Sequence, residues 1–241
     1  MERILSKLDE YFGKNDYAAA ERHLLYWLAE KRGTSAALTL YNELMGVYRK
    51  TAQEEKALSA VKDALQNVNS LGLDGTVTAA TTYLNAATVL HAFSRAEEGF
   101  PFFERAKVIY EKELSAHDAR LGGLYNNMAT ALVTLRRFDE ADALYKKAIA
   151  IMQEKEGGAL EVAVTLLNMA SAVEEEKGAE EGENAISSLL EEAKTLLEGH
   201  APRDGYYAFV LSKCAPVYRY FGHFRYANEL EGRVKDIYEG T

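Results

Sequence analysis

The chain has 241 residues, of which 48% are hydrophobic, and it carries a formal net charge of -9 with a pI near 5.2. This length and composition allow a large buried core, whereas the acidic balance opposes any binding that needs clustered lysine and arginine to neutralise phosphates. No apolar run approaches the roughly 18 residues of a membrane span, and the N-terminus lacks the apolar stretch of a signal peptide. We therefore expect a cytoplasmic protein that binds neither nucleic acid nor a membrane.

The N-terminal segment 1–35 predicts a helix pair, over about 2–12 and 16–31. Gly13, Tyr17 and Ala20 follow the pattern of the later segments, but Trp27 stands where a small residue is expected. Terminal repeats of helical arrays commonly differ from internal ones because one of their faces has no neighbour. We expect this segment to be a divergent capping pair.

Five further segments share one pattern, and they are 36–78, 79–120, 121–160, 161–203 and 204–241. Within each segment the apolar residues fall on one face of a helix, as Leu124, Met128, Ala131 and Leu135 do in the third. Small or slender residues recur in the first half at Met45, Ala87, Ala129, Ala170 and Cys214–Ala215, and in the second half at Ala64, Ala106, Ala148, Ala193 and Val234. Because helices approach closely only where side chains are short, each segment predicts two antiparallel helices.

The fourth segment is longer than the others between its two small residues. Ala170 and Ala193 lie 23 positions apart, whereas Ala129 and Ala148 lie 19 positions apart. We expect the four extra residues in the glycine-containing turn 177–184, and we expect that turn to protrude.

Segment 124–151, LYNNMATALVTLRRFDEADALYKKAIAI, resembles the tetratricopeptide repeat in its longer form of about 42 residues, as found in kinesin light chains. The resemblance rests on the paired asparagines, on Ala129 and Leu132, on Phe138 in the turn, and on Ala141, Tyr145 and Ala148. About 200 of the 241 residues fall under it. It implies an all-α fold, a right-handed α-α superhelix of about six antiparallel helix pairs forming a single solenoid domain over 1–241.

The resemblance also implies that the first helices of successive pairs line a concave groove. Asparagines then recur on that face at Asn85, Asn127 and Asn168, next to Thr88 and Thr130. An asparagine amide both donates and accepts, so a row of them suits the backbone of an extended peptide. The simpler alternative is that these amides bond a neighbouring helix or face solvent.

Charged residues flank this row, and the resemblance implies that basic ones read an acidic side chain or a terminal carboxylate. The candidates are Arg49, Lys50, Lys213 and Arg219, with His91 on the same face. Lysine and arginine also cover solvated helix faces by default. Glu174 and Glu175 on the same inferred face weaken a simple preference for acidic ligands.

No pattern predicts catalysis, a cofactor or a metal site. The five histidines, His23, His91, His117, His200 and His223, lack the short spacing of a helical metal site. The single cysteine, Cys214, excludes an intrachain disulfide and is expected to act as a small hydrophobe inside a helix. No phosphate loop, nucleophile elbow or carboxylate pair is recognisable. We expect a protein that is not an enzyme.

The leading hypothesis is a module that binds a peptide or protein partner in the groove. An alternative is a self-associating scaffold, dimerising through a C-terminal end where Val234 and Ile237 stay exposed. A third interpretation is the sensor domain of a regulator that responds to a signalling peptide.

Overall fold

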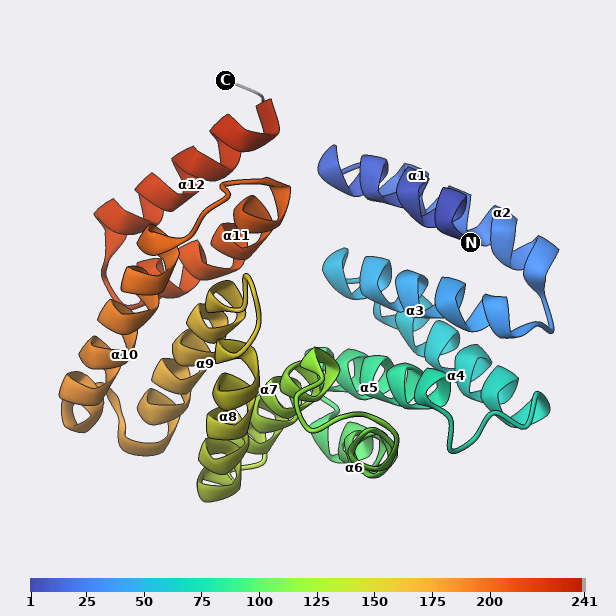
Figure 1. Ribbon diagram of the computed structural model, residues 1–241, viewed down its shortest axis with the longest axis horizontal. Coiled ribbons are helices and arrows are strands. Elements are labelled where there is room, and N and C mark those ends of the chain that lie inside the picture. Colours follow the sequence, from blue (N-terminus) through green and yellow to red (C-terminus); the bar gives the residue numbers. More distant parts are fainter. Residues whose placement is uncertain (240–241) are drawn as a thin grey trace. The chain divides into compact units, whose positions relative to one another are not determined.

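The computed structural model describes residues 1–239, so the last two positions of the predicted repeat 204–241 lie outside it. Over the described residues the fold consists of twelve α-helices without strands (Figure 1). They are α1 (Glu2–Gly13), α2 (Tyr17–Lys31), α3 (Ser35–Lys50), α4 (Glu54–Ser70), α5 (Val77–Ala92), α6 (Ala96–Glu113), α7 (Ala119–Thr134), α8 (Phe138–Gln153), α9 (Ala159–Lys177), α10 (Ala179–Gly199), α11 (Gly205–Tyr220) and α12 (Phe224–Glu239). The predicted all-α helical-repeat architecture is confirmed.

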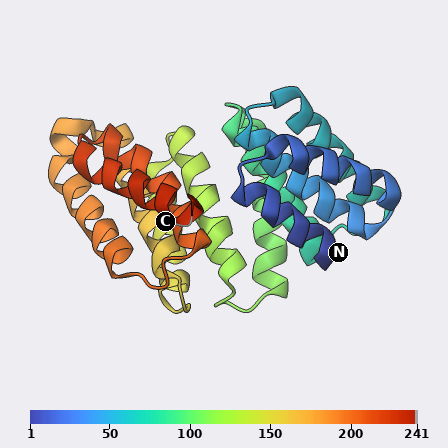
Figure 2. The ribbon, with the colours of Figure 1, turned by 90° about the horizontal axis from the view of Figure 1, so that it is seen from above.

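Consecutive helices pack as antiparallel pairs, from α1 with α2 to α11 with α12. The pairs belong to two compact units, one over Met1–Ser115 with α1 to α6 and one that begins at Ala116 and holds α7 to α12. Within each unit, successive pairs stack side by side, as two views of the ribbon show (Figures 1 and 2). The continuous solenoid over 1–241 stays a prediction, and each unit is described by itself.

A left-handed residue reverses the chain within most pairs. Ala52, for example, has a φ of 54°, and the next N–H, that of Gln53, donates to the carbonyl of Tyr48 at 2.9 Å. This bond caps the first helix and turns the chain back in very few residues. Residues with positive φ occupy the same place in the other short turns, at Asn15, Ser94, Arg136 and Gly222.

Three of the loops between pairs end on a side chain that caps the next helix, at Thr76, Asp118 and Asp204. The Thr76 hydroxyl accepts a hydrogen bond from the N–H of Ala79 at 3.2 Å, and the Asp204 carboxylate accepts one from the N–H of Tyr207 at 3.0 Å. Such bonds satisfy N–H groups that have no partner inside the helix. Helices α5, α7 and α11 therefore begin at fixed residues.

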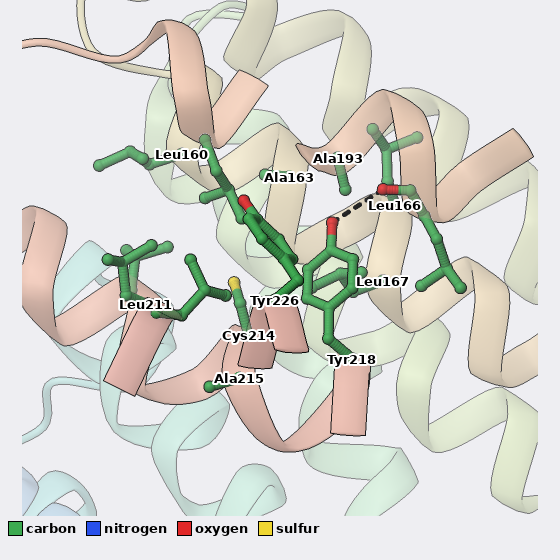
Figure 3. Close-up of a cluster of buried hydrophobic side chains, with 14 of the residues drawn as sticks. Leu160, Ala163, Leu166, Leu167, Ala193, Leu211, Cys214, Ala215, Tyr218 and Tyr226 are labelled. Atoms are coloured by element: carbon green, nitrogen blue, oxygen red, sulfur yellow. Dashed lines mark hydrogen bonds between the residues drawn. The ribbon is translucent and has the colours of Figure 1, made fainter. Parts of the chain in front are cut away.

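The small residues lie at the helix seams, as the spacing predicts. Ala87, Ala106, Ala129 and Ala148 have no exposed surface. In the second unit, Cys214 is only 1% exposed and packs with Ala193 and Leu166 in the core shown in Figure 3. The Tyr218 hydroxyl crosses this core to donate to the carbonyl of Leu190 at 2.8 Å (Figure 3).

The fourth predicted segment differs from expectation, because its extra residues lengthen the helices. Helices α9 and α10 have 19 and 21 residues, and only Gly178 lies between them, so the prediction of a protruding turn over 177–184 is wrong. Gly178 has a φ of 82° and a ψ of 165°, a conformation that is open essentially only to glycine. Gly182 is a buried helical residue, and a Cβ there would lie 2.9 Å from Cγ1 of Val173. This second glycine lets α10 approach α9 closely. It lies in the stretch that the sequence pattern predicts to be a turn.

Three apolar residues of the end pairs that the sequence singles out are partly covered. Trp27 is half-buried, with its ring 5.3 Å from that of Tyr26 and 6.5 Å from that of His23. Val234 and Ile237 on α12 are half-buried and pack against the core of the second unit. The expectation that these two side chains stay exposed, on which the scaffold hypothesis depended, is therefore wrong.

Candidate functional site

The first helices lie next to one another within each unit, α3 beside α5 in the first unit, and α7, α9 and α11 in the second. Hydrogen bonds between them fix their register. The Asn42 amide donates to the Thr82 hydroxyl at 3.4 Å, and the Asn168 amide donates to the side-chain oxygen of Asn126 at 3.0 Å. Equivalent repeat positions therefore lie level with each other and form rows across each unit.

In the first unit the first helix α3 carries two charged side chains, Glu43 and Arg49, that form no ion pair within the described residues. Burial raises the pKa of the Glu43 carboxyl, and the charge of Asp9 raises it further. Burial lowers the pKa of Arg49 and that of His91. Among residues 1–239, neither Glu43 nor Arg49 forms a salt bridge. Glu43 and Arg49 are thus surrounded by protein atoms, but no oppositely charged side chain among the described residues pairs with them.

The other predicted residues of the first unit differ in how they are held. The Lys50 ammonium lies 5.8 Å from the centre of the Tyr17 ring on α2. The Thr88 hydroxyl donates to the carbonyl of Leu84 on its own helix at 2.8 Å. Asn85 is half-buried, and its side chain makes no hydrogen bond with any part of the chain that the structure describes.

In the second unit the two predicted asparagines have different environments. Asn168 is bonded to Asn126 on the neighbouring helix, which is the simpler of the two roles expected for it. Asn127 is half-buried, and within the described residues its amide has no hydrogen-bond partner. The Thr130 hydroxyl donates to the carbonyl of Asn126 at 3.0 Å and lies 3.2 Å from the Tyr145 hydroxyl.

Helix α11 holds the two predicted basic residues of the second unit. The Arg219 guanidinium donates to Glu231 at 2.7 Å and to Asn228 at 2.9 Å, both on α12, so it connects the two helices of its own pair. The Lys213 ammonium lies 4.2 Å from the centre of the Phe209 ring. The role of either residue in binding a ligand stays a prediction.

Exposed aromatic side chains on the same face of α11 are a feature that the sequence interpretation did not single out. Tyr206 is 47% exposed, Phe209 37% and Tyr220 69%, and the first two rings stack at 6.3 Å. Their positions continue the helical stripe that contains Lys213 and Pro216. That shared spacing is the signal by which the sequence could have identified them.

The comparisons with known proteins agree with this geometry. Residues 78–154 match the family model described as the tetratricopeptide repeat. Over this stretch the chain is built of tetratricopeptide repeats. Among solved structures it is similar to BtubC (BKLC) from P. vanneervenii, with a TM-score of 0.67 and 19% identity over 83% of this chain and 82% of that one. It is also similar to a putative kinesin light chain from Podosopora anserina with nearly identical TPR-like repeats, with a TM-score of 0.58 and 16% identity over 84% of this chain and 95% of that one.

The predicted resemblance to tetratricopeptide repeats of the kinesin light chain type is confirmed. At these levels of identity the likeness to the solved structures is one of fold. None of the curated proteins matches the chain.

The single cysteine is buried in the core of the second unit. Burial raises the pKa of the Cys214 thiol to about 12, so this group is a protonated, inaccessible side chain at neutral pH. The described residues contain no group of three or more histidine, cysteine, aspartate or glutamate side chains placed to hold a metal ion. No helix among them has the length and apolar character needed to cross a membrane.

Proposed function

We propose that the chain binds an extended segment of a partner protein along the faces of its first helices, as a cytoplasmic interaction module and not as an enzyme. Tetratricopeptide repeats generally mediate protein–protein interaction. The observation that carries the proposal is the state of Asn85 and Asn127, which are half-buried and have no hydrogen-bond partner within the described residues. Their polar atoms are not among the buried atoms without a partner, so water can satisfy them in the free protein and a ligand's backbone can replace that water.

The backbone of an extended peptide supplies the missing partners. Each asparagine can accept a hydrogen bond from a peptide N–H and donate one to a peptide C=O, independently of the ligand's side chains. The Thr88 hydroxyl already donates to its own helix, which leaves its oxygen as an acceptor, whereas the Thr130 oxygen already faces the Tyr145 hydroxyl. In the first unit, the unpaired charge of Arg49 adds a group that can discriminate among side chains.

The proposal is tested by selecting peptides from a displayed random library on the intact protein and measuring their affinities for two variants. Asn127→Ala removes an amide that bonds nothing in the free protein, so it should weaken the selected peptides about tenfold and leave the thermal midpoint unchanged. Asn184→Ala, at an exposed asparagine of α10, is the matched control and should change neither quantity. The proposal is wrong if no peptide is enriched, or if Asn127→Ala binds the selected peptides as tightly as the wild type does.

A further inference from the structure

The exposed face of α11 carries three aromatic side chains. Tyr206, Phe209 and Tyr220 occur at positions that place them along one side of the helix, with Lys213 between them. Exposed aromatic side chains gathered on one face are typical of interaction surfaces, since each buries a large area at small entropic cost. The chemistry around this stripe indicates which kind of partner it fits.

Each end of the stripe places a tyrosine beside a glutamate of α9. The Tyr206 hydroxyl donates to the carboxylate of Glu161. Fourteen residues further along α11, Tyr220 lies near enough to Glu174 for this carboxylate to raise the pKa of the tyrosine. Within residues 1–239, neither glutamate forms a salt bridge with a lysine or an arginine. The two ends therefore offer the same pair of groups, an aromatic ring and a carboxylate without a cation.

This pair of groups suits a basic side chain. A guanidinium or ammonium can donate charge-assisted hydrogen bonds to the carboxylate, which the tyrosine hydroxyl holds in place, while its flat or methylene part lies against the ring. The centre of the stripe is different, because the Lys213 ammonium lies over the Phe209 ring and repels a further cation. An apolar residue of the ligand fits there better than a basic one.

The distance between the two ends sets the spacing of the ligand's charges. Tyr206 and Tyr220 are separated by 14 residues of helix, or about 21 Å at the rise of an α-helix. Glu161 and Glu174 are separated by 13 residues, or about 20 Å. An extended chain advances about 3.4 Å per residue, so roughly six residues cover this distance.

Building on the proposed function, we propose that the second unit selects a partner segment with two basic residues about six positions apart and an apolar residue between them. Tyr206 with Glu161 binds one basic residue, Tyr220 with Glu174 binds the other, and Phe209 contacts the apolar residue. This specificity is opposite in charge to the acidic ligand that the basic residues of the sequence suggest.

The test measures fluorescence anisotropy of the intact protein with a labelled synthetic peptide that has two arginines about six positions apart and a leucine midway. A second peptide has the same composition with the arginines adjacent. We expect the spaced peptide to bind about tenfold more tightly. Glu161→Gln and Glu174→Gln should each weaken it about tenfold, because each removes one charge partner. Glu192→Gln, at an exposed glutamate of α10, should leave the affinity unchanged.

Three outcomes would overturn the inference. Equal affinity for the two peptides, or equal loss in all three variants, would show attraction to the acidic surface in general. A mass that doubles with concentration in light scattering, and returns to that of a monomer in Tyr220→Ser, would assign the stripe to a second copy of the chain. Library peptides that depend on Asn127 but lack paired basic residues would contradict this inference while leaving the proposed function intact. Circular dichroism of each variant checks that the helices are retained.

Discussion

Two equivalent asparagines show how much a single partner matters at the residue scale. Asn126 accepts a hydrogen bond from Asn168 at 3.0 Å. Asn42 occupies the same repeat position on α3, but its side-chain oxygen is buried without a donor. The repeat equivalent of Asn168 is Asn85, whose amide makes no hydrogen bond within the described residues. Similar local sequences thus produce an asparagine pair in the second unit, whereas in the first unit the Asn42 oxygen has no donor.

This difference predicts that replacing each asparagine by alanine lowers the free energy of unfolding by different amounts. Asn126→Ala should lower the free energy of unfolding by about 1–2 kcal/mol, because it removes a hydrogen bond and leaves the Asn168 amide without its acceptor. Asn42→Ala should cost less, about 0.5–1 kcal/mol, since it removes the long hydrogen bond to Thr82 together with a buried oxygen that has no donor. Urea denaturation of both variants gives the comparison. Equal losses would contradict this account of the pair.

The buried thiol of Cys214 and the buried hydroxyl of Tyr145 predict that the free energy of unfolding falls in alkali. Burial raises the pKa of Cys214 from 9.0 to about 12, and burial raises that of Tyr145 from 10.0 to about 12. Above about pH 9 the unfolded chain releases these protons while the folded chain keeps them, so the unfolded state binds fewer protons and stability falls as pH rises. The loss should extend from about pH 9 to 12. Urea midpoints measured across this range should decline less steeply in Cys214→Ala, and an identical slope would argue against the contribution of the thiol.

At the scale of the element, the turn decides how long a helix pair becomes. Five turns close around a left-handed residue, with Ala52 and Gly222 as examples. The turn between α9 and α10 uses Gly178 alone, and these are the two longest helices of the described chain. The extra residues could be absorbed as helix because Gly182 permits close contact with Val173. One backbone position and one missing side chain thus set the length of the pair.

Gly178→Ala should destabilise the protein by about 1–3 kcal/mol, because its backbone conformation is strained for any residue with a Cβ. The control is Gly232→Ala on α12, where an added Cβ meets no atom within 4 Å. That change should stabilise the protein by about 0.5–1 kcal/mol, since alanine favours a helix interior. Thermal unfolding of both variants checks the opposite signs, and a neutral Gly178→Ala would show that the turn can adopt another conformation.

At the scale of the whole molecule, the chain forms two compact units with three helix pairs each. In helical repeats each pair contacts mainly its neighbours, so stability is close to a sum of pair and interface terms. Each unit has a hydrophobic core formed by its own residues, with Leu44 and Met45 among those of the first and Leu211 and Tyr218 among those of the second.

We therefore expect fragments 1–115 and 116–241 to fold when expressed separately. Both should give the circular dichroism of α-helices and a cooperative thermal transition, because each contains a hydrophobic cluster formed by its own residues. A mixture of the two fragments provides the reference. A fragment that lacks helical signal alone but gains it in the mixture would contradict the independence of the units.

The sequence by itself determined the helix pairs and their seams. Apolar residues at helical spacing and small residues such as Ala87 and Ala129 recur about every 42 positions. That information is local, because helix formation depends on neighbouring residues and close packing depends on side-chain size at a repeated position. For this reason the sequence alone is enough to reveal the resemblance to tetratricopeptide repeats.

Only the tertiary structure decided the partner of each polar or aromatic side chain. Asn127 and Asn168 are equivalent in the sequence pattern, yet only Asn168 has a hydrogen-bond acceptor on the neighbouring helix. Tyr206 meets Glu161 from 45 positions away because α9 and α11 lie side by side. A partner across a seam depends on the register of two helices and on the rotamers at the contact, and repeat spacing specifies neither.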